Sequence, residues 1–133
     1  IDGYEIELSG RILDQLELSM SYTDYDGETT SQNKEVPEHQ FSAFANYQVN
    51  DDFGIGVGVI SQGDQQIGSS ATPYLPSFER VDVAAYWKLA DDLMLQMNIE
   101  NLFDETYFPH SHSTHQASVG EEMNARVSIR RTF

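Results

Sequence analysis

Hydrophobic and polar residues alternate along most of this chain, and the alternation predicts seven β-strands. A period of two places successive side chains on opposite sides of an extended backbone, so each segment acquires one apolar and one polar side. The pattern predicts strands over residues 4–12, 16–23, 40–49, 53–59, 81–89, 93–100 and 123–133. Within the third of these, Phe44 departs from the alternation. No segment has a helical period, so the predicted fold class is all-β.

The connections between these strands are alternately short and long. Residues 14–15, 50–52 and 90–92 form tight turns rich in Asp and Asn, whereas longer polar loops cover 26–37, 62–77 and 108–120. The chain is therefore expected to be an antiparallel up-and-down meander with short turns at one end and long loops at the other. That arrangement is typical of a bacterial outer-membrane β-barrel, and strands of about ten residues suit a tilted membrane crossing.

Aromatic residues gather near both ends of the predicted strands, which predicts the two aromatic girdles of a membrane barrel. The alternative is the general preference of aromatic residues for strands. The short-turn end has Tyr47, Phe53, Trp87 and Phe133, and the long-loop end has Tyr4, Tyr22, Tyr25, Phe41, Phe78, Tyr107 and Phe108.

Length, hydropathy and charge narrow the possibilities further. The 133 residues are enough for one domain. No run approaches about 18 consecutive apolar residues, so no transmembrane helix is expected. The mean hydropathy of -0.47 still allows a barrel, whose strands are only half apolar. Seven Lys and Arg stand against 22 Asp and Glu, a net charge of -15, so nucleic acid is not an expected partner. There are no cysteines.

The alternation alone leaves three functional classes open. In a soluble antiparallel β-sandwich or small barrel that binds a ligand, the apolar side would be the core. In a membrane barrel, the apolar side faces lipid and the polar side lines the lumen. An outer-membrane enzyme such as a barrel hydrolase would need Ser111 or Ser113 with His112, but no strained turn or fixed acid completes a triad. We therefore expect no enzymatic activity.

Four segments together resemble the C-terminal part of TonB-dependent outer-membrane receptors, most closely the ferric-siderophore branch. Their residues are Asn101-Leu102-Phe103-Asp104 with Tyr107, Gly120-Glu121-Glu122-Met123-Asn124, the closing run Val127, Ile129 and Phe133, and Tyr74-Leu75-Pro76-Ser77-Phe78 before Arg80-Val81-Asp82. The family commonly has the first segment on its penultimate strand, so the sixth strand is expected to end in residues 101–107. Arg131 departs from the family, in which an aromatic residue is common at that position.

The resemblance implies that residues 1–133 are the C-terminal part of a transmembrane β-barrel of about 22 strands, without its plug domain. The implied function is uptake of a ferric siderophore or similar metal chelate across the bacterial outer membrane. The implied partners are that chelate, outer-membrane lipid and the TonB complex, which would act through an N-terminal region that this chain lacks. No cofactor is expected, because the iron chelate is the substrate. Gly54, Gly56 and Gly58 are expected to leave room for the plug or other backbone.

A loop rich in histidine carries the candidate site. His110, His112 and His115 fall within six residues, and imidazole binds zinc, copper, nickel and iron. The loop therefore either holds a metal, contacts substrate together with Tyr74, or has no specific role. His39, at the start of the third strand, lies near the same rim and could approach.

Charged residues on the polar side predict a second feature. Lys88, Arg126 and Arg130 share this side with Asp82 and Glu100, so salt bridges along a lumen wall are expected.

Overall fold

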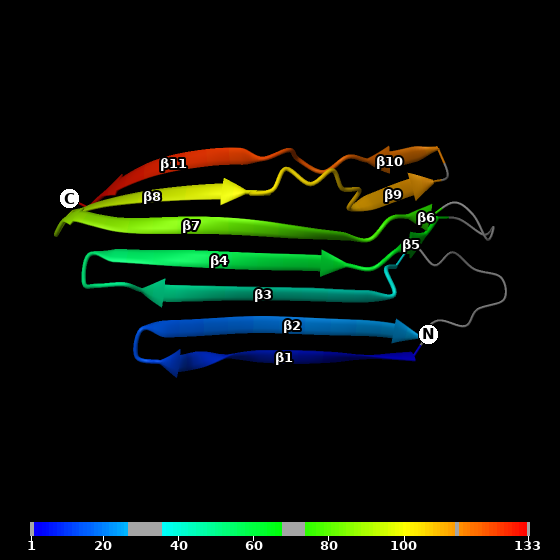
Figure 1. The fold of residues 1–133 in the computed structure, drawn as a ribbon, viewed down its shortest axis with the longest axis horizontal. Helices are drawn as coiled ribbons and strands as arrows, with labels where there is room; N and C mark the ends of the chain where they lie inside the picture. Colours follow the sequence, from blue (N-terminus) through cyan, green and yellow to red (C-terminus); the bar gives the residue numbers. More distant parts are fainter. Residues whose placement is uncertain (1, 27–35, 68–73, 114, 133) are drawn as a thin grey trace.

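The computed structural model describes residues 2–26, 36–67, 74–113 and 115–132. Its main element is an antiparallel sheet of seven strands, ordered β1-β2-β3-β4-β7-β8-β11, so each long strand pairs with the next along the chain (Figure 1). The strands are β1 (Asp2–Leu13), β2 (Leu16–Asp26), β3 (His39–Gln48), β4 (Phe53–Gln62), β7 (Phe78–Ala90), β8 (Leu93–Glu100) and β11 (Asn124–Arg131). The predicted all-β meander is confirmed.

Two small hairpins, each a separate two-stranded sheet, lie at the long-loop end. β5 (Gln65–Gln66) pairs with β6 (Tyr74–Leu75), and β9 (His110–Ser113) pairs with β10 (Gln116–Ser118). The predicted tight turns lie at the opposite end (Figure 1). The described residues contain no helix of the length and apolar character needed to cross a membrane.

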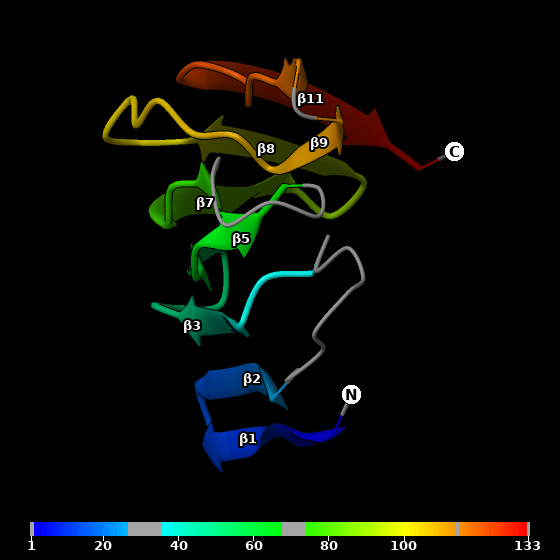
Figure 2. The same ribbon diagram turned by 90° about the vertical axis from the view of Figure 1, so that its right-hand side faces the viewer.

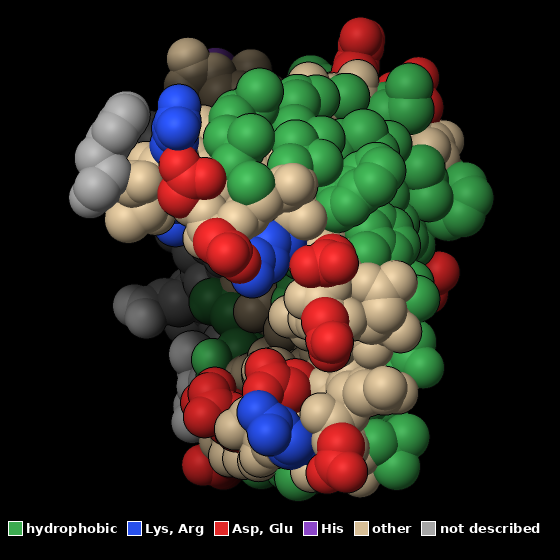
Figure 3. All heavy atoms as spheres, turned by 90° about the vertical axis from the view of Figure 1, so that its left-hand side faces the viewer, with side chains coloured by type: hydrophobic (Ala, Val, Ile, Leu, Met, Phe, Trp, Pro, Cys, Tyr) green, Lys and Arg blue, Asp and Glu red, His purple; other side chains and the backbone are tan. Residues whose placement is uncertain are grey.

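The strand register gathers the apolar side chains of the seven long strands onto one side of the sheet. One cross-strand row consists of Gly10, Leu18, Ala45, Val57, Val83, Ile99 and Ala125, and the next of Leu8, Met20, Ala43, Val59 and Val81. We call this side the apolar face and the other the polar face. A row of the polar face consists of Glu17, Asn46, Gly56, Ala84, Asn98 and Arg126. Figure 3 shows hydrophobic side chains covering one side of the molecule.

The apolar face is not the core of the described structure. Ile6, Leu8, Val127 and Ile129 are between 56% and 68% exposed. The buried apolar residues of the described part are Ile67, Leu75, Phe78 and Tyr107. None of these four belongs to the two apolar rows, so the alternative of a soluble β-sandwich or small barrel, in which those rows would pack as a core, is not supported.

The segment 101–107 differs from its predicted conformation. β8 ends at Glu100, and a turn replaces the expected end of the sixth strand. Asn101 and Asp104 both have φ of 53°, in the left-handed region that Asn and Asp tolerate better than most residues. Two such residues three positions apart cannot continue a strand. The prediction failed because the Asn101 side chain bonds to the backbone of Glu105 and closes a turn, which alternation does not reveal.

The space beside the glycines of β4 is occupied by side chains of the same sheet. A Cβ atom at Gly56 would lie 3.0 Å from Cζ of Phe44, and one at Gly58 would lie 3.4 Å from Cδ2 of the same ring. Phe44 pairs with Gly58 in the register and lies on the polar face, which explains its departure from the alternation. The space at Gly56 and Gly58 is therefore taken by Phe44, and the expectation that it receives a plug or other backbone is corrected.

Candidate functional site

The candidate site lies at the long-loop end of the sheet, where the segment after β8 supports the β9–β10 hairpin. Figure 1 shows both small hairpins at this end, and Figure 2 looks onto it. Two residues that the sequence did not point to as site residues, Arg80 and Asn101, make the hydrogen bonds that hold this end together.

Asn101 is the best buried side chain of the described residues, at 1% exposed. Its backbone N–H donates to Oδ1 of Asp82 at 2.8 Å. Its side-chain Nδ2 donates to the carbonyl oxygens of Glu105 (2.9 Å) and Glu121 (3.0 Å), and its Oδ1 accepts from the Glu105 N–H at 2.9 Å. The backbone N–H and the side-chain amide of this one residue thereby join β7, the turn after β8 and the approach to β11. Buried polar groups satisfied in this way hold the backbone in one arrangement.

Tyr107 closes the other end of the same segment. Its ring stacks on Phe78 with centroids 4.6 Å apart, and its hydroxyl accepts from Nη1 of Arg80 at 2.9 Å. Nη2 of Arg80 donates to Oδ2 of Asp82 at 2.7 Å. Phe78 and Tyr107 are only 8% and 6% exposed. Their predicted place in the aromatic girdle at this end is therefore wrong, because both rings are buried within the protein.

Gly120 fits against Tyr107 because it has no side chain. Its N–H donates to the Tyr107 carbonyl at 2.7 Å, and a Cβ atom there would lie 2.2 Å from Cζ of the ring. The segment between them, which contains the β9–β10 hairpin, therefore begins and ends side by side.

The predicted histidines lie on this hairpin. His110 is exposed on β9, and its Nε2 is 3.0 Å from the hydroxyl of Ser118, its register partner on β10. His115 is exposed in the hairpin turn. The side chain of His112 lies outside the described residues. No group of three possible metal ligands is found among the side chains that the structure describes, which leaves the three-histidine metal site a prediction.

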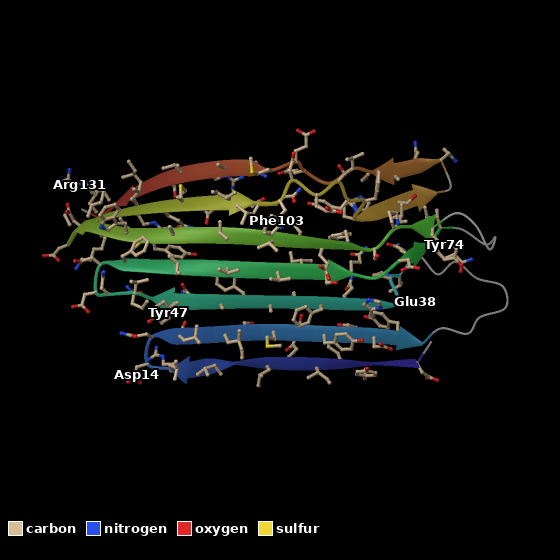
Figure 4. All side chains as sticks on the ribbon, in the orientation of Figure 1. Asp14, Glu38, Tyr47, Tyr74, Phe103 and Arg131 are labelled. Carbon is tan, nitrogen blue, oxygen red and sulfur yellow. The ribbon has the colours of Figure 1, made fainter. Side chains whose placement is uncertain are left out.

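Tyr74 and His39 occupy different places at this end. Tyr74 lies on β6, 52% exposed, and pairs with Gln66. Figure 4 shows it at the tip of the long-loop end. His39 contacts the position of Gly63, where a Cβ atom would lie 2.7 Å from Cε1 of the imidazole. It lines a cleft of about 560 Å³ with Glu79, Phe103 and other residues, but His110 and His115 are not among them.

The ion pairs of the polar face differ from those predicted. Asp82 pairs with Arg80, and Lys88 pairs with Asp91 in the β7–β8 turn, Nζ to Oδ1 at 2.8 Å. The hydrogen bond from the Lys88 ammonium lowers the pKa of the Asp91 carboxyl. Lys88 therefore ties down a short turn rather than lining the wall with Asp82 or Glu100.

Comparison with known proteins relates the whole sheet to one family. The family model described as TonB dependent receptor-like, beta-barrel matches residues 1–102. The probable TonB-dependent siderophore receptor PiuA of Acinetobacter baumannii is 28% identical over 97% of this chain. The metal-pseudopaline receptor CntO of Pseudomonas aeruginosa is 28% identical over 96%, and the catecholate siderophore receptor Fiu of Escherichia coli is 29% identical over 80%.

Solved structures agree with this relationship. The crystal structure of PiuA superposes on 98% of this chain with a TM-score of 0.91 and 26% identity. The superposed part is 21% of the PiuA chain. The pyoverdine receptor FpvA of P. aeruginosa, bound to pyoverdine, gives a TM-score of 0.85 with 26% identity over 98% of this chain and 21% of its own. This chain spans 20% of the length of PiuA and of CntO, and 16% of Fiu.

Proposed function

This chain belongs to the TonB-dependent receptor-like β-barrel family of the outer membrane, and from that membership we propose that it is part of a receptor for a ferric siderophore or similar metal chelate. It would be the C-terminal portion of the barrel, residues 1–133. The relatives named as siderophore and metal-pseudopaline receptors support this substrate class. As partners we propose outer-membrane lipid on the apolar face and the TonB complex, acting on the N-terminal region of the complete receptor.

One observation carries the proposal. The same sheet has an exposed apolar face, suited to lipid, and at one end a histidine-bearing hairpin held on a hydrogen-bonded base. The apolar face suits a membrane wall, and loops held on a rigid scaffold are where binding residues concentrate. The two together suit capture of a solute at the surface.

We propose that His110, His112, His115 and Tyr74 meet the substrate. Exposed imidazole and phenol groups on loops can contact a metal chelate through its metal or its organic shell. The base formed by Asn101, Tyr107 and Gly120 would hold the hairpin in position without touching the chelate.

The test measures uptake of radioactive iron by cells whose other siderophore receptors are deleted and which produce the complete receptor. The iron is supplied as a catecholate chelate or as ferripyoverdine, and a metal–pseudopaline chelate is supplied separately. We expect energy-dependent uptake of at least one of these. Failure to take up any, by a receptor shown to reach the outer membrane, would reject the proposed function.

The contact residues are tested in the same cells. Replacing 110–118 by a Gly/Ser segment of equal length keeps Tyr107 and Gly120, and should reduce affinity for the transported chelate by at least about tenfold, or 1.4 kcal/mol. The matched control replaces Asp91 and Asp92, in the turn at the opposite end, and should leave affinity unchanged. Equal affinity in the loop variant and the control would remove His110, His112 and His115 from the site.

A further inference from the structure

The side chain of Phe103 is unusually exposed for an aromatic residue. It is 72% exposed, the highest value among the large apolar side chains that the structure describes. It lies in the turn after β8, not on a strand whose alternation would force it outward. Single exposed apolar residues are common on protein surfaces, so the informative feature is that a rigid turn holds this ring outward beside an exposed apolar face.

The turn that carries Phe103 is held at both ends. Asn101 makes the buried hydrogen bonds described above, and the Asp104 N–H donates to the Asn101 carbonyl at 2.9 Å. Oδ1 of Asp104 accepts from the Met123 N–H at 2.8 Å, which ties the turn to the approach of β11. With left-handed backbone at both Asn101 and Asp104, the exposed position of the ring is a fixed property of the turn.

The turn projects on the apolar side of the sheet. The Leu102 N–H donates to the carbonyl of Val81 at 2.8 Å, which fixes the start of the turn next to β7 at that residue. Phe103 also lines the cleft of about 560 Å³ with Val81, Ser61 and Glu79. In Figure 2 the yellow segment after β8 projects to the left, which corresponds to the hydrophobic right-hand side of Figure 3.

We infer that Phe103 inserts into the outer leaflet and anchors the receptor at the boundary between acyl chains and headgroups. The partner is membrane lipid, because the ring continues the apolar face that the family places in the bilayer. Glu79 and Glu105, which line the same cleft, stay hydrated and limit how deeply the ring enters. This anchor takes the place of Phe78 and Tyr107, which are buried. It requires the membrane location alone and not the proposed substrate.

The experiment measures the depth of a spin label at position 103. The complete receptor, freed of any other cysteines, carries Phe103→Cys and is reconstituted in vesicles of phosphatidylethanolamine and phosphatidylglycerol. Collision rates with oxygen, which concentrates in lipid, and with a nickel chelate, which stays in water, give the depth. Glu122→Cys is the aqueous control and Val127→Cys, 62% exposed on the strand, is the lipid control.

A ratio of oxygen to nickel collisions between those of the two controls is the expected result. A ratio equal to that of Glu122→Cys would place the ring in water and overturn the inference. Exclusion of both reagents would show that protein covers it, either another part of the receptor or a second copy, and would overturn it too.

A second variant avoids the spin label, which could itself disturb the turn. Phe103→Trp keeps an aromatic ring, and its added fluorescence should be quenched by lipids brominated near the headgroup end of the acyl chain. Absence of quenching, in a receptor that folds and inserts, would reject lipid contact.

Discussion

At the scale of single residues, a few polar side chains decide how the long-loop end is built. Asn101 satisfies three backbone groups that the turn would otherwise leave without partners inside the protein. Arg80 bridges Asp82 and Tyr107, and the Tyr107 ring in turn requires that position 120 have no side chain. The residue type at each of these positions is therefore required by a different contact.

Gly120→Ala tests the closest of these contacts. The added methyl group would overlap the Tyr107 ring, so we expect the complete receptor to lose about 1–3 kcal/mol of unfolding free energy. The matched control is Gly10→Ala on β1, where no atom lies within 4 Å of the new Cβ, with an expected change within about 0.5 kcal/mol. Denaturant unfolding in vesicles measures both. Similar values for the two variants would show that the ring moves aside freely.

At the scale of elements, the loop end combines a rigid turn with a hairpin that depends on it. The turn 101–107 is bonded to β7, to residue 121 and to residue 123. The β9–β10 hairpin is short, and its register shifts between Gln116 and Ala117. A two-stranded hairpin of this size has little stability of its own, so its position depends on the base beneath it.

Hydrogen exchange of the complete receptor should show this difference. Amides of 101–107 are expected to exchange more slowly than those of 110–118, because local opening of the turn breaks buried hydrogen bonds. Asn101→Ala leaves those groups unsatisfied, at a cost of about 1–3 kcal/mol, and should speed exchange of the turn by about tenfold for each 1.4 kcal/mol. Uniform exchange across both segments in the unsubstituted receptor would contradict the assignment of a rigid base.

At the scale of the whole molecule, the sheet replaces a packed core with contact to the membrane. Seven strands place their apolar side chains on one face, and this face stays exposed in the described structure. In water such a surface would drive association, whereas in a bilayer it is covered by lipid. The position of the chain in the outer membrane is thus part of its stability.

A pair of adjacent substitutions on β2 tests which face meets lipid. Met20 lies in an apolar row near the middle of its strand, and Ser19 lies beside it on the polar face. Met20→Lys places a charge on the lipid side and should lower the unfolding free energy in vesicles, by up to about 2–4 kcal/mol depending on its depth in the bilayer. Ser19→Lys keeps its charge on the lumen side and should cost much less. A larger loss from Ser19→Lys would reverse the assigned faces.

The loop end was less predictable than the strands. The motif 101–107 can be identified in the sequence, but alternation cannot reveal that Asn101 and Asp104 adopt left-handed backbone, so the sequence predicts a strand where the structure has a turn. Phe78 and Tyr107 were assigned to a girdle, although their rings stack on each other. The histidines were found from their spacing, whereas Arg80 and Asn101 were missed as site residues. Asn101 bonds to Asp82 and Glu121, and Arg80 bonds to Tyr107. In each case the partner lies 19 or more residues away along the chain, where a local pattern does not reach.

Period-two alternation and short turns are enough to predict the seven strands, their antiparallel order and the division of each into an apolar and a polar side. Three further features are visible only once the chain is folded: the register that joins the apolar sides into one face, the packing of Phe44 over Gly56 and Gly58, and the turn that exposes Phe103 while burying Tyr107. These features depend on contacts between distant segments, which a local pattern does not encode.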